Sequence, residues 1–250
     1  MSRIIIDMKY SFIETFRDKT NLIFLFIFPT VMFLLLGNIL GGLGSQLQST
    51  EAGMNYFDFL LPGILAIFIM TAAQMAAGTI VHYRRSGVFR KLATTPISNM
   101  EWIAARIIMW TILVLLSLAV AIFVAWLVIG IHPNINLISL LLMIAGTALF
   151  AGMGILVANF VKNEEAALSV TAAIIFPLTL VSGTFIPVET MSWFLQYLAI
   201  ISPLTCLSEG LRSSMITGNY GDGITNLIIV AILGIILFGI GTATFNWKED

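Results

Sequence analysis

Six long apolar runs dominate the chain, and each reaches about the ~20 residues that an α-helix needs to cross a bilayer core. Only 10% of the 250 residues are charged, whereas a water-soluble domain carries about 25%. The sequence therefore predicts an all-α polytopic membrane protein, built as a single membrane domain over residues 1–250. The expected transmembrane helices cover approximately 22–40, 59–81, 103–131, 137–161, 166–186 and 224–245.

The basic residues indicate an orientation. If the N-terminus is cytoplasmic, eleven of the twelve lysines and arginines lie on the cytoplasmic side or at its edge, and only Arg212 lies outside. Such an excess in the short cytoplasmic loops of membrane proteins sets their topology. We therefore expect both termini in the cytoplasm. Arg106, at the start of the third run, can extend its head group to the membrane interface.

The stretch VSGTFIPVETMSWFLQYLAIISPLT, residues 181–205, is apolar and about as long as a span. It contains Pro187, Glu189 and Pro203, however, and each proline removes an amide donor that lipid cannot replace. If this stretch crossed the membrane, Arg212 and Lys248 would exchange sides, and the number of basic residues on each side would not change. The backbone chemistry therefore decides the topology. We expect 187–203 to form a re-entrant or interfacial helical hairpin on the outer face, without crossing.

Two cytoplasmic segments have helical patterns. In residues 1–21, Ile5, Met8, Phe12 and Phe16 recur at helical spacing, which is typical of an amphipathic helix lying in the membrane interface. Such a helix serves as an anchor, which the periodicity favours, or as a docking surface for a cytoplasmic partner.

The loop at 82–100 is basic and contains a possible short helix, Val88–Leu92. A basic loop of this kind usually contacts anionic lipid headgroups. Alternatively, Phe89 and Leu92 can seat in a groove on a soluble protein, and spacing alone leaves both interpretations open.

Several functions are disfavoured by what the sequence lacks. The interiors of the six apolar runs contain no Asp, Glu, Lys or Arg, whereas proton-driven carriers normally have ionisable residues at these positions. The sequences GxSxG, HExxH and GxxxxGK[ST] are absent, so we expect no catalytic, cofactor or metal residues and no ATP hydrolysis by this chain alone. The polar residues Gln74, Thr171 and Ser182 are candidates to line a pathway, although such residues more often join helices.

Two segments resemble the membrane subunits of ATP-binding-cassette type-2 exporters, in particular the drug-resistance and antibiotic-export branch. GVFRKLATTPIS, residues 87–98, is similar to the family's coupling segment, although Tyr83 and Arg85 stand where that family often has glutamates. SGTFIPVETMSWFLQYLAIISPLTCLSEGLR, residues 182–212, resembles the segment between its fifth and sixth spans, with Ser192 where many members have proline.

The resemblance implies a permease in the cell membrane that exports a lipophilic small molecule by alternating access. Two permease copies, identical or related, would pair with two cytoplasmic ATPase subunits that hold ATP and magnesium; contact with membrane lipids and no nucleic acid is expected. The implied ATPase-coupling residues are Gly87, Phe89, Arg90, Lys91, Leu92, Pro96 and Ser98, and those of the outer gate are Gly183, Pro187, Glu189, Trp193 and Pro203. Alternatives are a permease for polysaccharide or lipid-linked glycan, and a channel or non-transporting membrane scaffold.

Overall fold

The computed structural model describes residues 26–44, 56–92 and 99–244, and within these ranges the chain is helical and has no strand. The all-helical membrane fold predicted from the sequence is thereby confirmed. The expected interfacial helix at 1–21 lies outside the described residues. The helices, in chain order, are α3 (Phe28–Gly44), α4 (Tyr56–Arg85), α5 (Val88–Leu92), α6 (Asn99–Ile129), α7 (Leu137–Phe160), α8 (Glu164–Val181), α9 (Trp193–Ile201), α10 (Pro203–Arg212) and α11 (Tyr220–Thr244).

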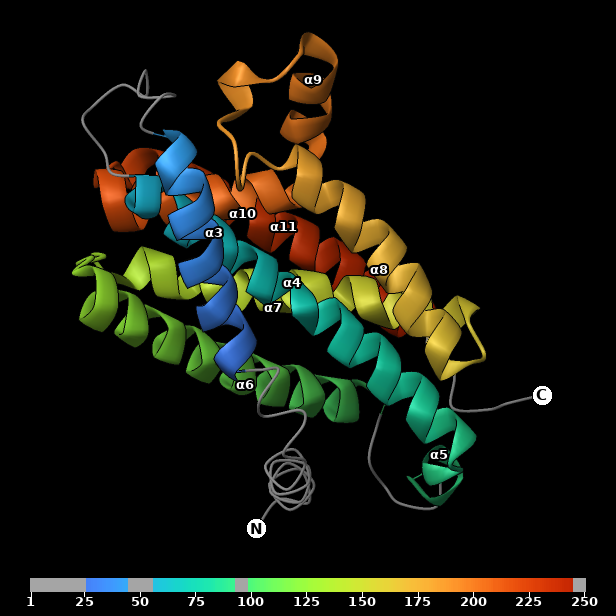
Figure 1. Cartoon of the computed structure of the whole chain (residues 1–250). Helices are drawn as coiled ribbons and strands as arrows, with labels where there is room; N and C mark the ends of the chain where they lie inside the picture. The colour runs from blue at the N-terminus through green and yellow to red at the C-terminus, as the bar shows by residue number, and fades with distance from the viewer. Residues whose placement is uncertain (1–25, 45–55, 93–98, 245–250) are drawn as a thin grey trace.

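Five of these helices, α4, α6, α7, α8 and α11, are long and apolar enough to span a membrane. The helix α3 has 17 residues, and it packs against α4 through edge-to-face contacts such as the one between Phe33 and Phe57. Figure 1 shows α5 and α9 at opposite ends of the bundle. We refer to these as the α5 end and the α9 end.

Small residues let the central helices approach closely. A Cβ atom on Gly154 of α7 would overlap the carbonyl oxygen of Ala73 in α4. On the other face of α7, a Cβ on Gly152 would lie 3.0 Å from the backbone nitrogen of Phe238 in α11. Since lipid is as apolar as the side chains, close backbone packing of this kind is a main force that holds membrane helices together.

The helices α7 and α11 run in the same direction. Near their first residues, Gly223 approaches Ile138, and near their last residues the Asn159 side chain donates a hydrogen bond to the Gly241 carbonyl, at 3.1 Å. Arg84, beside α5 at the end of α4, bonds the Ala158 carbonyl in the last turn of α7, so both helices begin at the α9 end and finish at the α5 end.

The helix α8 runs in the opposite direction to α4. Its first residue, Glu164, lies 3.2 Å from His82 near the end of α4, and Thr184, just beyond α8, packs on Gly63 near the start of α4. The chain thus leaves α8 at the α9 end, where α11 later begins. The segment 182–219 starts and finishes at one end of the bundle, so it does not cross.

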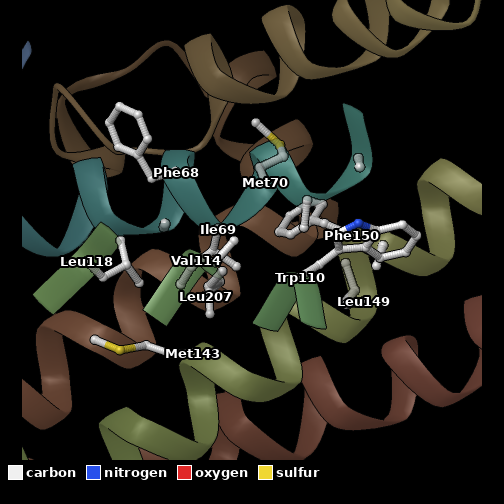
Figure 2. Packing of buried hydrophobic residues seen from close by; sticks show 14 of the residues in the cluster. Phe68, Ile69, Met70, Trp110, Val114, Leu118, Met143, Leu149, Phe150 and Leu207 are labelled. Atoms are coloured by element: carbon white, nitrogen blue, oxygen red, sulfur yellow. The ribbon is translucent and has the colours of Figure 1, made fainter. Parts of the chain in front are cut away.

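Within that segment, α9 and α10 meet at a bend of 85°. We name α9 and α10 the re-entrant pair. The pair continues through a π turn to Thr217, so it is longer than the predicted hairpin at 187–203, and its α10 packs into the core. Figure 2 shows its Leu207 within the cluster formed by Ile69 of α4, Val114 of α6 and Phe150 of α7. Pro203 occupies the first turn of α10, where no amide donor is needed.

Candidate functional site

The α5 end begins with a sharp turn at Gly87. Its φ of +71° lies in the left-handed region, which glycine adopts without strain. The Ser86 amide donates to the His82 carbonyl at 2.9 Å and closes the last turn of α4. The turn redirects the chain into α5, the short helix that the sequence predicted at Val88–Leu92.

An aromatic cluster fixes α5 to the bundle. The Phe89 ring is only 3% exposed and packs edge to face on Trp102 of α6 and Tyr83 of α4, with centroids 5.1 Å and 6.2 Å apart. This corrects the expectation that Phe89 inserts into a groove on another protein, because the ring is buried inside its own chain. We name Tyr83, Phe89, Trp102 and Arg106 the α5 anchor.

Arg106 completes the α5 anchor from α6. It is 3% exposed, and its guanidinium carbon lies 4.9 Å from the Tyr83 ring centroid and 5.3 Å from that of Trp102. Its Nη2 donates to the Tyr83 hydroxyl at 3.2 Å. Aromatic faces attract a guanidinium, and these two rings hold the Arg106 head group inside the chain.

The structure describes part of the remaining coupling segment. Arg90 is exposed on α5, and Lys91 and Leu92 complete that helix. Pro96 and Ser98 lie outside the described residues.

Two of the loop's basic residues act within the chain. Arg84 Nη1 donates to the Ala158 carbonyl at 2.9 Å, in the last turn of α7, and Arg85 Nη1 donates to Asn163 Oδ1 at 3.1 Å. The last carbonyls of a helix have no intrahelical partner, so Arg84 satisfies one of them. Together with the pair of His82 and Glu164, these bonds hold the end of α4 to the turn between α7 and α8.

At the α9 end, the residues after α8 form a turn whose carbonyls are held by side chains. Gly183 has a φ of +67°, and a Cβ atom there would overlap the Val188 side chain. The Ser208 hydroxyl shares its hydrogen between the Thr205 carbonyl at 3.1 Å and the Ser182 carbonyl at 3.4 Å, and Tyr56 Oη donates to the Phe185 carbonyl at 2.9 Å. The turn is therefore bonded to both α4 and α10.

Arg212, the last residue of α10, makes the third of these bonds. Its Nη2 donates to the Gly183 carbonyl at 3.3 Å and to the Phe59 carbonyl at 3.5 Å. Its guanidinium carbon lies 3.9 Å from the centroid of the Phe59 ring. The sequence identifies Arg212 only as a basic residue on the expected outer side. Its bond to Phe59 joins positions 153 residues apart, and no local sequence pattern could have indicated it.

The remaining residues assigned to an outer gate lie along the re-entrant pair. Pro187 precedes a short 3-10 turn that includes the exposed Glu189. Trp193 begins α9 and is 73% exposed, with its ring edge-to-face on Tyr197. The Gln196 side chain donates to the Glu189 and Met191 carbonyls and closes this turn onto α9.

Of the three candidate pathway residues, Gln74 belongs to α4, and Thr171 and Ser182 belong to α8 and its C-terminal cap. Thr171 and Ser182 are buried inside the chain, where Thr171 Oγ1 donates to the Ala167 carbonyl at 2.7 Å and Ser182 Oγ donates to the Thr179 carbonyl at 3.1 Å. Gln74 is half-buried on α4. Within this chain, the two hydroxyls are satisfied by their own helix.

The sequence matches the ABC-2 type transporter family over residues 3–216, which is most of the chain. The chain belongs to this family. The matched domain is the transmembrane part of a transporter and not its ATPase, so the protein is a multi-pass membrane permease subunit.

Curated relatives of the permease are distant. It is 26% identical over 180 residues to the linearmycin resistance permease protein LnrN of Bacillus subtilis (strain 168), covering 70% of this chain and 44% of the relative. It is 24% identical over 196 residues to the probable multidrug ABC transporter permease YbhS of Escherichia coli (strain K12), covering 76% and 50%. The permease thus spans about half the length, or less, of these relatives.

Proposed function

We propose that this permease moves a lipophilic drug-like or antibiotic molecule outward across the cell membrane by alternating access, powered by a separate ATPase subunit. The observation that carries the proposal is the α5 anchor. A five-residue helix at one end of the bundle is held to two long helices through a buried ring, so a force applied to α5 reaches both of them.

The helix α4 is the element that would carry this movement. It runs from Arg85 beside α5 to Tyr56, whose hydroxyl bonds the turn after α8. Its 30 residues correspond to about 45 Å at ~1.5 Å per residue, the full depth of a bilayer. Packed interfaces tend to switch between discrete arrangements, so α4 can relay a change at the α5 end to the α9 end.

The orientation in this proposal is supported by the distribution of basic residues, which favours a cytoplasmic α5 end. There, two ATPase subunits with bound ATP and magnesium would contact α5, with Arg90 and Lys91 facing acidic groups. A second permease, identical or related, would complete the pathway. The re-entrant pair would then form the outer gate, with its exposed aromatic residues at the outer interface.

The names of the relatives favour drugs or antibiotics as cargo, since LnrN is named for linearmycin resistance and YbhS for multidrug transport. A permease for polysaccharide or lipid-linked glycan is the alternative within transport. From another class, a channel or a non-transporting membrane scaffold would need no ATPase.

The decisive experiment is co-purification of a P-loop ATPase subunit, followed by reconstitution in lipid nanodiscs and measurement of ATP hydrolysis with and without candidate cargo. We expect cargo to stimulate hydrolysis, and the double variant Arg90→Glu, Lys91→Glu to abolish the stimulation while inserting normally. Lys162→Glu, which reverses an exposed charge at the same end but off α5, is the matched control. Full stimulation in the double variant would contradict docking through α5.

A further inference from the structure

We propose that Ser182, Gly183, Thr184 and Phe185 form a latch that holds the re-entrant pair closed against α4, with Gly183 as the hinge. The inference rests on the proposed function, because it identifies the contacts that must break when the outer gate opens. It concerns a structural property that can be measured without ATP, cargo or a partner.

The latch consists of three carbonyl groups within four consecutive residues, each accepting a hydrogen bond from a side chain of another element. Tyr56 on α4 donates to Phe185 at 2.9 Å, and Arg212 on α10 donates to Gly183 at 3.3 Å. The third bond, from Ser208 to Ser182 at 3.4 Å, is shared with the Thr205 carbonyl at 3.1 Å. Since all three donors are side chains, the bonds can open without unwinding a helix.

The donors belong to two different helices, α4 and α10. Tyr56 sits in the first turn of α4, and Arg212 bridges the latch to the Phe59 carbonyl, also on α4. A shift of α4 relative to α10 and the latch would therefore lengthen two bonds together, the one from Tyr56 to Phe185 and the one from Arg212 to Phe59. Arg212 Nε is buried without a hydrogen-bond partner among the described residues, so the closed arrangement is not fully satisfied.

The fit of the latch on α4 depends on Gly63. A Cβ atom at this position would lie 2.7 Å from the Thr184 carbonyl oxygen and 3.1 Å from its Cα. Both atoms belong to the backbone and cannot rotate away. Only glycine at position 63 therefore allows the latch to pack against α4. Gly183 has a φ of +67°, a conformation that is strained for other residues, and it is the residue about which the latch would turn.

The test is hydrogen–deuterium exchange of the purified permease in lipid nanodiscs, followed by mass spectrometry of peptides covering 182–192. Tyr56→Phe removes one hydroxyl and keeps the ring. We expect it to accelerate exchange in these peptides about three- to tenfold, the effect of one hydrogen bond on a local opening equilibrium. Gly63→Ala should accelerate it by at least as much, because the added methyl displaces the latch.

Gly239→Ala is the matched control, since a Cβ atom at this helical glycine of α11 meets nothing within 4 Å. It should leave exchange in 182–192 unchanged, and protected amides of α7 and α11 in every variant show that the fold persists. Unchanged exchange in Tyr56→Phe would overturn the latch, even if Gly63→Ala fails to fold. If exchange rises as expected while no ATP-driven export is found, the latch stands and the proposed function falls.

Discussion

Replacing Phe89 by alanine tests whether α5 is coupled to the bundle through its buried ring. The ring contacts Trp102 and Tyr83 and is almost fully enclosed. Truncating a core phenylalanine to alanine costs about 3–5 kcal/mol, and we take the low end, about 3 kcal/mol, because α5 is short and lies at the edge of the bundle. At ~1.4 kcal/mol per factor of ten, α5 should detach from α4 and α6 about 150-fold more often.

Two measurements follow this detachment. Hydrogen exchange of peptides covering 86–92 should rise strongly in Phe89→Ala, while exchange within α7 stays as in the wild type. In the proposed assembly with an ATPase subunit, ATP hydrolysis should continue but lose its dependence on cargo, because movement of that subunit no longer reaches α4. Phe89→Leu, which keeps most of the apolar volume, should give values between those of Phe89→Ala and the wild type in both measurements.

The control is Phe176→Ala, a truncation of the same size at a ring that is exposed on α8. It should leave both measurements near wild type. Wild-type exchange at 86–92 in Phe89→Ala would refute the reasoning, because α5 would then be held by something other than the ring.

Three further outcomes are expected. Gly154→Ala should lower the melting temperature in detergent by several degrees or prevent folding, because overpacking costs about 1–3 kcal/mol and the added methyl meets the backbone of α4. Gly239→Ala should melt like the wild type. Equal melting temperatures of the two variants would contradict the close approach of α7 and α4. Arg84→Gln leaves the Ala158 carbonyl without its donor and should speed exchange at 158–164 severalfold, and no change there would show that this bond contributes nothing. Cys206, half-buried on α10, should react slowly with a membrane-impermeant maleimide added outside intact cells, and labelling only from the cytoplasmic side would invert the assigned orientation.

The helical architecture could be predicted because lipid forces the choice. Every backbone amide and carbonyl within a bilayer needs an internal partner, so long apolar runs become helices whatever their other neighbours. Pro187 and Pro203 likewise restrict the backbone locally, and both lie at the start of a helical turn in the structure.

The contacts that define the two ends could not be read in the same way. Five residues of α5 are too few for a periodicity, so the sequence gives no sign of which side of Phe89 is covered. Arg106 and Arg212 enter a charge count as interfacial cations, but they bind Tyr83 and Gly183, which are 23 and 29 residues away in the chain. Such pairs form only when packing brings distant helices together.

The return of the chain to the α9 end after α10 has a consequence for how the family can vary. A segment that departs from one side and comes back to it adds nothing to the number of crossings. Residues can be gained or lost around α9, which is largely exposed, while the buried α10 stays in place and α11 keeps its direction. The helix α9, which is proposed to belong to the outer gate, is thus a part of the permease that can change in length while every membrane-spanning helix keeps its direction.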